Sequence, residues 1–171
     1  MRISVTVAAA ALLITTGATA AHASSADPAT TQSDEISATA LEWDTGVHTY
    51  SYPPADCPYA SKSGVMACFE AYGDKWWVAD TDIDGWSAAT HWKNYLQDQN
   101  GNWLLAREGI CINKSGGHTR AVCDKNYYEN STYPNGAFGQ GSYLTWRACL
   151  YKSSTNQWNG CSSWTTVLNS N

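Results

Sequence analysis

The sequence lacks most of the short motifs that mark enzymes. It has no His-Glu-x-x-His zinc motif, no Cys-x-x-Cys redox motif and no glycine-rich phosphate-binding loop. The segment Gly85–Ala89 (GWSAA) matches a serine nucleophile elbow only in part, and no strand-turn-helix pattern surrounds it. Glu70 and Asp74 are the residue types of a glycosidase pair, but a chain of this size hardly provides the deep cleft that such a hydrolase needs. We therefore expect a protein that is not an enzyme.

The chain also lacks an excess of positive charge. It has 10 Lys and Arg against 15 Asp and Glu, a net charge of −5, and no cluster of basic residues. Nucleic acids and anionic membrane surfaces attract basic patches, so neither is expected as a partner. No apolar stretch beyond the N-terminal region is long enough to insert into a membrane. The remaining expectation is a monomer whose partner is an extracellular glycan or protein.

Residues 1–23 have the layout of a secretory signal peptide. Arg2 supplies a positive charge, an uncharged stretch follows, and Ala21-His22-Ala23 fits the small-x-small cleavage site. The strongly apolar part, Val7–Ile14, is too short to cross a bilayer. Residues 24–40 are small and polar with no aromatic residue, which predicts a disordered leader. We expect a secreted, extracellular protein in which residues 41–171 form one domain.

Aliphatic side chains are scarce in this expected domain. From residue 41 onward it holds seven Leu, three Ile, five Val and two Phe, against 9 Trp and 10 Tyr. Aromatic rings must therefore supply much of the core, since each buries far more area than a valine. A core this poor in aliphatic residues also gains from covalent cross-links, each contributing roughly 2–3 kcal/mol for a short loop.

The six cysteines form three short pairs along the sequence: Cys57 with Cys68, Cys111 with Cys123, and Cys149 with Cys161. The last two pairs share the pattern Cys-x2-Lys-Ser-x7-Cys, and every interval contains a turn signal. Cross-strand Cβ atoms in an antiparallel pair lie about 4.5–5.5 Å apart, so disulfides across local hairpins are predicted. The alternative is a long-range bridge from Cys68 or Cys111 to a distant strand. The cysteines indicate an oxidising compartment.

Period-two alternation of apolar residues, interrupted by turn signals, predicts an all-β fold. Tight turns without intervening helices favour an antiparallel β-sandwich. On residues 142–151 one face is expected to hold Leu144, Trp146, Ala148 and Leu150. The eight expected strands are Val47–Tyr52, Val65–Tyr72, Lys75–Asp80, Ser87–Tyr95, Trp103–Ile112, Thr119–Tyr127, Ser142–Tyr151 and Trp158–Leu168, and residues 133–141 are the one long loop.

The dipeptide Gly73-Asp74 predicts a two-residue type II′ hairpin turn, which pairs Tyr72 with Lys75. Because successive strand residues point to opposite faces, Trp76 is expected in the core and Trp77 on the outer face. The core face of this hairpin is then Phe69, Ala71, Trp76 and Val78.

The outer face of this hairpin is the candidate ligand-binding surface, made of Trp77, Tyr72, Glu70 and Lys75. Flat rings flanked by hydrogen-bonding groups can stack on a sugar ring or hold a protein partner. The alternative is a purely structural face, covered by the Cys57 bridge, by the Tyr52–Cys57 segment or by the 133–141 loop. Three tryptophans near strand ends or turns are further candidates with less geometry behind them: Trp43, Trp86 and Trp158.

The segment Asp80-Thr-Asp82-Ile-Asp84-Gly85 matches the opening of a calcium-binding loop. Three carboxylates at alternate positions, followed by a glycine turn, can wrap a hard cation. The twelfth position should be glutamate but is His91, and no helical pattern brackets the loop. A weak calcium site formed by Asp80, Asp82 and Asp84 is therefore one hypothesis, and a strand-to-strand turn with solvated acids is the other. No other cofactor is expected.

Several short motifs look like those of a known group of proteins: Gly64–Phe69 (GVMACF), Tyr72–Trp76 (YGDKW), Asp84–Ala88 (DGWSA), Arg107–Asn113 (REGICIN), Cys123–Asn126 (CDKN) and Cys161–Trp164 (CSSW). Through them the chain resembles small exported proteins of actinomycetes that are mostly uncharacterised. The resemblance spans roughly residues 57–164. It implies a secreted β domain with sequence-local cysteines, and it carries no established activity or functional residue.

A secreted protease inhibitor is the second functional hypothesis. Such a protein needs a rigid, exposed loop flanked by disulfides, and the turns at residues 61–64 and 113–118 are the candidates. Lys62 or Lys114 would supply a basic side chain for a trypsin-like pocket.

Overall fold

The computed structural model describes residues 40–98, 100–128 and 141–169, all within the second of two units, Met1–Ser33 and Asp34–Asn171. The expected signal peptide, residues 24–39 of the leader and most of the 133–141 loop lie outside the described residues. The described residues form eleven strands and no helix, so the all-β prediction is confirmed. Within these ranges no helix is long and apolar enough to cross a membrane.

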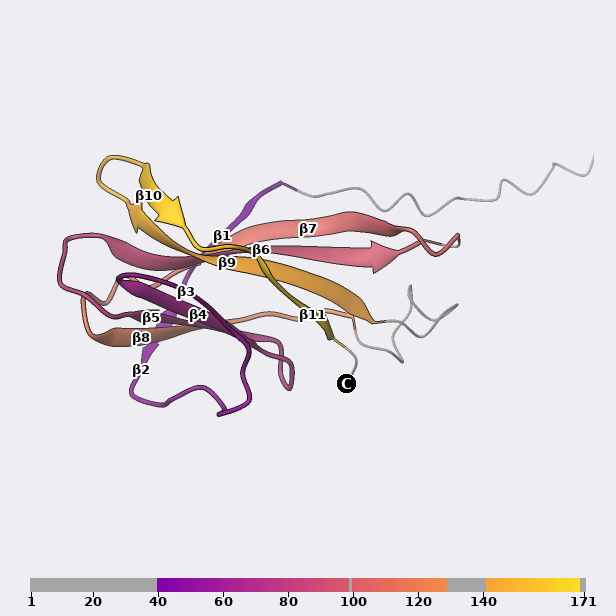
Figure 1. The fold of residues 1–171 in the computed structure, drawn as a ribbon, viewed down its shortest axis with the longest axis horizontal. Coiled ribbons are helices and arrows are strands. Elements are labelled where there is room, and N and C mark those ends of the chain that lie inside the picture. The colour runs from indigo at the N-terminus through magenta and orange to yellow at the C-terminus, as the bar shows by residue number, and fades with distance from the viewer. Residues whose placement is uncertain (1–39, 99, 129–140, 170–171) are drawn as a thin grey trace, which may run out of the picture. The chain divides into compact units, whose positions relative to one another are not determined.

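The strands form two sheets, seen one above the other in Figure 1. Sheet A has the order β1 (Glu42–Thr45), β7 (Trp103–Ile112), β6 (Ser87–Gln97), β9 (Ser142–Lys152) and β10 (Gln157–Cys161), and β11 (Thr165–Asn169) also pairs with β9. Sheet B has the order β2 (Val47–Thr49), β8 (Thr119–Asp124), β5 (Lys75–Asp80), β4 (Val65–Glu70) and β3 (Tyr59–Lys62). The recorded pairs are antiparallel except that of β1 with β7, which is parallel.

Aromatic rings fill the space between the two sheets. The ring of Trp76, on sheet B, lies 5.5 Å from that of Trp146 and 6.2 Å from that of Trp92, both on sheet A. Phe69 lies 4.6 Å from Trp76, and all four side chains are at most 1% exposed. The composition-based prediction of an aromatic core is confirmed. The expected inner face of β9 is buried as well, at Leu144, Trp146, Ala148 and Leu150.

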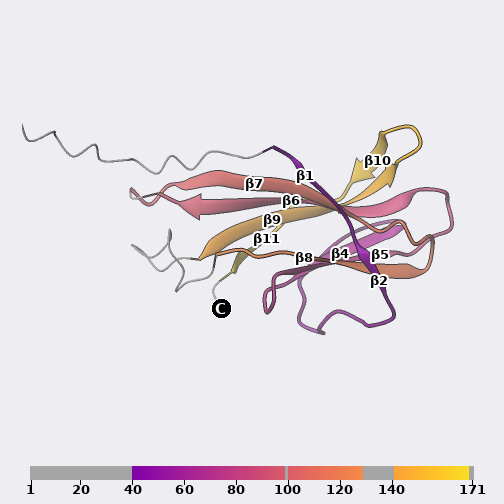
Figure 2. The same ribbon diagram turned by 180° about the vertical axis from the view of Figure 1, so that it is seen from behind.

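The first two strands carry the chain from sheet A to sheet B, as Figure 2 shows. Only Gly46 separates β1, which pairs with β7, from β2, which pairs with β8. A Cβ atom at residue 46 would lie 2.8 Å from the Cβ of Ala121, so the crossing requires glycine. The Gly46 N–H donates to the Ile112 carbonyl at 2.8 Å. This crossing brings an edge of each sheet together.

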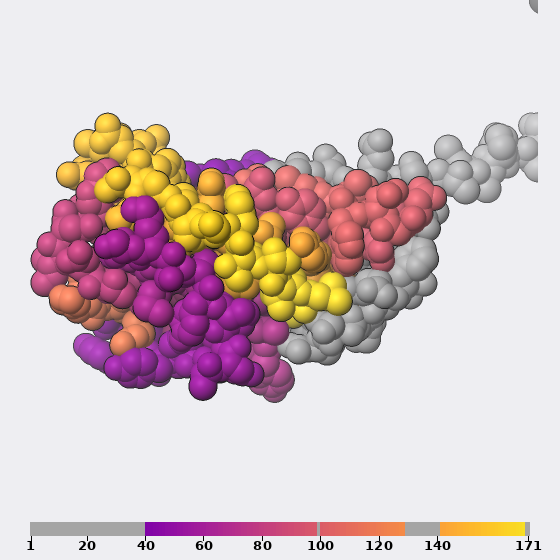
Figure 3. Space-filling model, viewed as in Figure 1, coloured from indigo at the N-terminus to yellow at the C-terminus, as the bar shows by residue number. Residues whose placement is uncertain are grey.

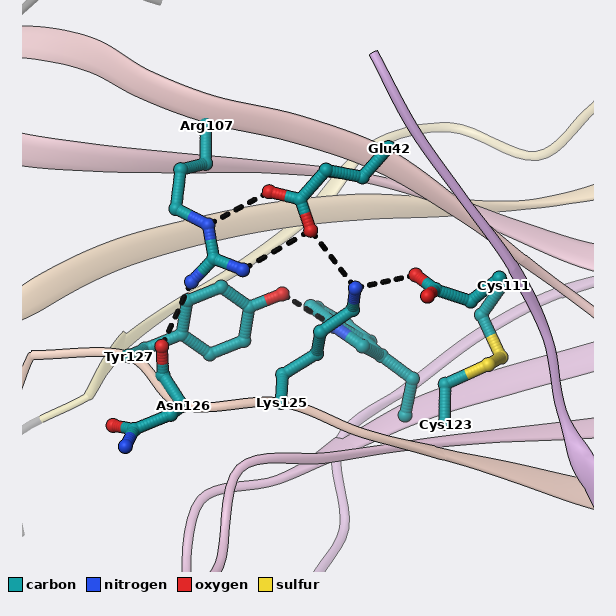
Figure 4. A network of polar contacts seen from close by, with 9 residues as sticks. Glu42, Arg107, Cys111, Cys123, Lys125, Asn126 and Tyr127 are labelled. Atoms are coloured by element: carbon teal, nitrogen blue, oxygen red, sulfur yellow. Dashed lines mark hydrogen bonds and ion pairs between the residues drawn. A yellow bond between two sulfur atoms is a disulfide. The ribbon is translucent and has the colours of Figure 1, made fainter. Parts of the chain in front are cut away.

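A network of charges joins β1 and β7 to the segment that follows β8 (Figure 4). Glu42 accepts hydrogen bonds from Arg107 Nε at 2.8 Å and Nη2 at 3.0 Å, and it pairs with Lys125 Nζ at 2.9 Å. Lys125 also pairs with Asp44, and Arg107 Nη1 donates to the Asn126 carbonyl at 2.7 Å. The Arg107 hydrogen bonds hold the pKa of Glu42 below its usual range. Two acids balance two bases, so this network is structural.

The described residues form eleven strands, whereas the sequence pattern predicted eight. β1 was missed because its inward residues, Glu42 and Asp44, are polar and pair with Lys125, which reverses the usual apolar-inward pattern. β3 was missed because its four residues are too few for a clear alternation.

The expected last strand is broken into β10 and β11. Ser162 N donates to the Ala148 carbonyl at 2.8 Å, and Ser162 Oγ accepts from Ala148 N at 3.0 Å. At the bend the serine hydroxyl thus takes the place of a backbone carbonyl as the partner of β9. Beyond the bend, Thr165 Oγ1 donates to the Tyr59 carbonyl of β3 at 3.5 Å. Figure 3 shows the C-terminal residues as a yellow band beside the purple atoms of the early strands.

The β4–β5 hairpin differs from the predicted one by two residues of register. Glu70 rather than Tyr72 lies opposite Lys75, so Ala71–Asp74 form a longer loop. Asp74 has a positive φ of 53°, which a type II′ turn does not give its second residue. Its buried carboxylate accepts from the Tyr127 N–H at 2.6 Å and from Asn169 Nδ2 at 2.9 Å, so contacts distant in sequence select the loop. An even shift keeps every side chain on its predicted face.

All three disulfides connect the cysteines that were predicted to pair, Cys57–Cys68, Cys111–Cys123 and Cys149–Cys161. Only the last spans an antiparallel hairpin directly, because Cys161 lies opposite Cys149. The second joins β7 of sheet A to β8 of sheet B, so it cross-links the two sheets. The first fixes the segment before β3 to β4. The predicted hairpin geometry is confirmed for the last bridge and is wrong for the second, while the first closes the β3–β4 hairpin from just outside its ladder.

Candidate functional site

Trp77 lies on the outer face of sheet B, as the sequence predicted, and Trp76 is buried. The Trp77 ring is half-buried, and its Nε1–H donates to Glu70 Oε2 at 2.7 Å. Glu70 lies opposite Lys75 in the ladder, so three of the four predicted ligand-binding residues share one face. Tyr72 is 86% exposed and lies in the hairpin loop, outside the ladder, because Glu70 rather than Tyr72 pairs with Lys75.

A hollow of about 200 Å³ opens beside Trp77 on this face. We call it the Trp77 hollow; its lining includes Tyr52, Tyr59, Met66, Cys68, Trp77 and Arg120. Met66, Cys68, Trp77 and Arg120 project from β4, β5 and β8, while Tyr52 and Pro53 belong to the segment held by the Cys57–Cys68 bridge. The Tyr52–Cys57 segment therefore covers one side of this face and leaves the Trp77 hollow open.

Arg120 is the charged group of the hollow. Its guanidinium carbon lies 3.7 Å from the centroid of the Tyr52 ring, which places the cation on the face of an exposed aromatic side chain. Among the described residues its side chain has no hydrogen-bond or ion-pair partner. None of the described residues that line the hollow is acidic. The sequence did not predict a role for Arg120, because a single arginine in a strand cannot be told from an ordinary surface residue.

The three carboxylates of the expected calcium loop do not converge. Each serves its own turn: Asp80 Oδ1 accepts from the Asp82 N–H, Asp82 Oδ1 from the Ile83 N–H and Asp84 Oδ1 from the Trp86 N–H. Asp80 is only 2% exposed, and burial raises the pKa of this carboxyl above its ordinary value. No group of three His, Cys, Asp or Glu residues within the described ranges is arranged to hold a metal ion. The structure favours the turn hypothesis over the calcium hypothesis.

The outer face of sheet A carries aromatic clusters that the sequence did not reveal. The ring centroids of Trp43 and Trp158 lie 5.6 Å and 4.7 Å from that of Tyr151, which belongs to a buried cluster with Ile110 and Ile112. Farther along the sheet, Tyr143 packs against Tyr95 and Trp103. Trp43 and Trp158 were named as candidates, but only the parallel pairing of β1 with β7 places Trp43 beside Ile110 on this face.

Between these clusters lies a polar network around His91. Arg147 donates from Nη2 and Nε to His91 Nδ1 at 3.0 and 3.2 Å, so that nitrogen is unprotonated. Nε2–H then donates to Glu108 Oε1 at 2.6 Å, and Lys93 Nζ lies 3.7 Å from the same oxygen. Burial lowers the pKa of His91, which agrees with a neutral imidazole. These charged groups satisfy one another, so this face offers a ligand fewer free groups than the Trp77 hollow.

The two loops proposed for protease inhibition are both short turns. Lys62 belongs to β3 and is only half-exposed, whereas Lys114 is exposed between Cys111 and Cys123. Buried Asn113 fixes the second turn through hydrogen bonds to Val78, Thr119 and Ser115. Positive φ at Gly116 and His118 makes this loop compact rather than extended. Inhibition therefore stays a prediction.

Comparisons with known proteins give no relative: no protein-family model, no curated protein and no solved structure matches the chain. Any functional assignment therefore depends on the chemistry of the site.

Proposed function

We propose that the chain is a secreted β-sandwich recognition module that binds an extracellular, cell-wall glycan at the Trp77 hollow. The observation that carries the proposal is the hollow itself, about 200 Å³ in volume, lined by three aromatic rings and by an arginine whose guanidinium has no hydrogen-bond or ion-pair partner among the described residues. The three disulfides support export, because they persist in oxidising compartments.

The chemistry of the lining suits a sugar better than a purely apolar ligand. Aromatic rings offer flat faces to the C–H side of a pyranose, while the Tyr hydroxyls and the Arg120 guanidinium offer hydrogen bonds to its hydroxyl groups. Small-molecule pockets usually enclose about 300–1,000 Å³. The hollow is smaller, so it fits one ring of a longer glycan chain rather than a whole enclosed ligand.

The rigidity of the wall supports binding by a preformed site. Cys57 ties the wall to Cys68 in the floor, and Pro53 and Pro54 limit the backbone freedom of the wall. A site that is ordered before binding loses little conformational entropy when a ligand arrives. We therefore expect the free protein to hold the hollow open.

The test uses variants of exposed rings, whose loss should not unfold the protein. Tyr52→Ala and Tyr59→Ala remove the two exposed rings of the hollow, and Tyr72→Ala removes a more exposed ring outside it. Binding is measured by co-sedimentation with insoluble peptidoglycan and by tryptophan fluorescence during titration with N-acetylglucosamine oligosaccharides. We expect each hollow variant to bind about tenfold more weakly, a change of about 1.4 kcal/mol, and Tyr72→Ala to bind like wild type.

Two results would contradict the proposal. One is a wild-type protein that binds neither preparation, and the other is equal loss of binding in Tyr72→Ala and in the hollow variants. Thermal unfolding of all variants separates lost binding from lost folding.

A further inference from the structure

We infer that the sugar held at the Trp77 hollow carries an oxyanion, a carboxylate or a phosphate, which pairs with Arg120. This inference rests on the proposed function, because it names the class of glycan that the same site selects. It follows from the electrostatics of the lining rather than from its rings.

The geometry of Arg120 leaves its donors available. Its guanidinium carbon lies 3.7 Å from the Tyr52 centroid, and such a contact uses the face of the cation. The five N–H donors lie in the guanidinium plane and point outward from its edge. Since no described residue accepts from them, an incoming oxyanion would meet a free, oriented fork.

Arg120 differs in this respect from the other arginines that the structure describes. Arg107 donates to Glu42 and to the Asn126 carbonyl, and Arg147 donates to His91. In the described part of the chain, Arg120 alone has ring contacts and no acceptor. The donors of Arg120 are therefore open to an acceptor from outside the chain.

The surroundings favour an anion at this point although the whole chain is acidic. No acidic side chain is among the described residues that line the hollow, and Glu70, on the same face of the sheet, already accepts from Trp77. The net charge of −5 gives no general attraction for anions, so any preference for an acidic sugar must arise locally. The partly desolvated position of Arg120 strengthens a pair formed there.

The experiment compares matched sugars on the full chain. The first pair is a tetrasaccharide of alternating glucuronic acid and N-acetylglucosamine and the same tetrasaccharide with its carboxyl groups reduced to alcohols. The second pair is N-acetylglucosamine 6-phosphate and N-acetylglucosamine. We expect wild type to bind one or both acidic members about 10- to 100-fold more tightly than their neutral partners, and the preferred pair identifies the source of the oxyanion.

Arg120→Gln should remove this preference. It should weaken binding of the neutral sugars far less than binding of the acidic ones, because the glutamine amide can still donate a hydrogen bond to a sugar hydroxyl. Arg120→Lys keeps the charge but loses the fork, so it should retain only part of the preference. Lys114→Gln removes one exposed positive charge away from the hollow and should bind like wild type. Thermal unfolding confirms that each variant is folded.

The results separate the two proposals. If wild type and Arg120→Gln bind acidic and neutral sugars equally, while Tyr52→Ala still weakens binding, the inference about Arg120 is overturned and the glycan proposal stands. If wild type binds none of these sugars and no peptidoglycan, the glycan proposal itself fails. Equal loss of the preference in Lys114→Gln would also overturn the inference, because net charge would then explain it.

Discussion

At the scale of single residues, the environment of a side chain depends on which face of a strand it occupies. Trp76 and Trp77 are adjacent, yet one is fully buried and the other lies against an open hollow. Pleating alone makes this distinction, so it was predictable from the sequence. The availability of the Arg120 guanidinium could not be predicted in this way. It depends on the neighbouring strand β5 and on the Tyr52–Cys57 segment, which the Cys57–Cys68 bridge holds in place.

His91 should make the stability of the fold depend on pH. Its folded-state pKa is lowered, so the unfolded chain binds the proton more readily, and the free energy of unfolding should fall as pH drops below the ordinary histidine value of about 6.5. Protonation also removes the acceptor at Nδ1 that Arg147 uses. Urea denaturation between about pH 5 and 7.5 measures this slope.

His91→Gln cannot titrate and should show a shallower slope in this window. His118→Gln changes an exposed histidine outside the network and is the matched control. The groups that face His91 are Glu108 on β7, Arg147 on β9, and Lys93 on its own strand β6, with the Trp164 ring beside them. A slope that is unchanged by His91→Gln would show that another group causes the pH dependence.

At the scale of elements, close contacts between strands place demands on single positions. On β7 the Cα of Gly109 faces the Trp92 ring of β6, and a Cβ there would lie 2.3 Å from Trp92 Cζ2. Gly109→Ala should therefore destabilise the protein by about 1–3 kcal/mol through overpacking, as measured by urea denaturation.

A double-mutant cycle tests the cause of this loss. Trp92→Phe removes the ring atoms that the new methyl would meet, so Gly109→Ala should cost less in that background. An equal cost in both backgrounds would exclude the Trp92 contact as the cause. Gly116→Ala adds the same methyl where nothing lies within 4 Å, and near-UV circular dichroism should show no change in core packing there.

The hairpin between β4 and β5 shows how far an element can be predicted. Alternation identified both strands and their faces, and an error of two residues in the turn left those faces intact. The register itself depends on the buried Asp74 carboxylate, which binds Tyr127 and Asn169 from distant parts of the chain. Local turn preferences contain no information about such contacts.

At the scale of the whole molecule, the spacing of the cysteines predicted their pairing but not their role. Two cysteines a dozen residues apart can lie on one hairpin or on facing sheets, and the sequence of the intervening turn is similar in both cases. Cys149 and Cys161 share a hairpin, whereas Cys111 and Cys123 join the two sheets. The difference arises because the chain changes sheet between β7 and β8, which no local pattern records.

These two bridges provide a matched comparison, because each closes a separation of 12 residues. The chain-entropy contribution is then the same, about 3 kcal/mol for loops of this length. Cys111 and Cys123 are both buried in the main core, whereas in the second pair Cys149 is buried and Cys161 is partly exposed, so removal of the first pair leaves the larger internal cavity. The Cys111→Ala/Cys123→Ala variant should therefore lose about 1–2 kcal/mol more than Cys149→Ala/Cys161→Ala in urea denaturation. Equal losses would mean that joining the sheets adds nothing beyond loop closure, and that the aromatic core alone holds sheet A against sheet B.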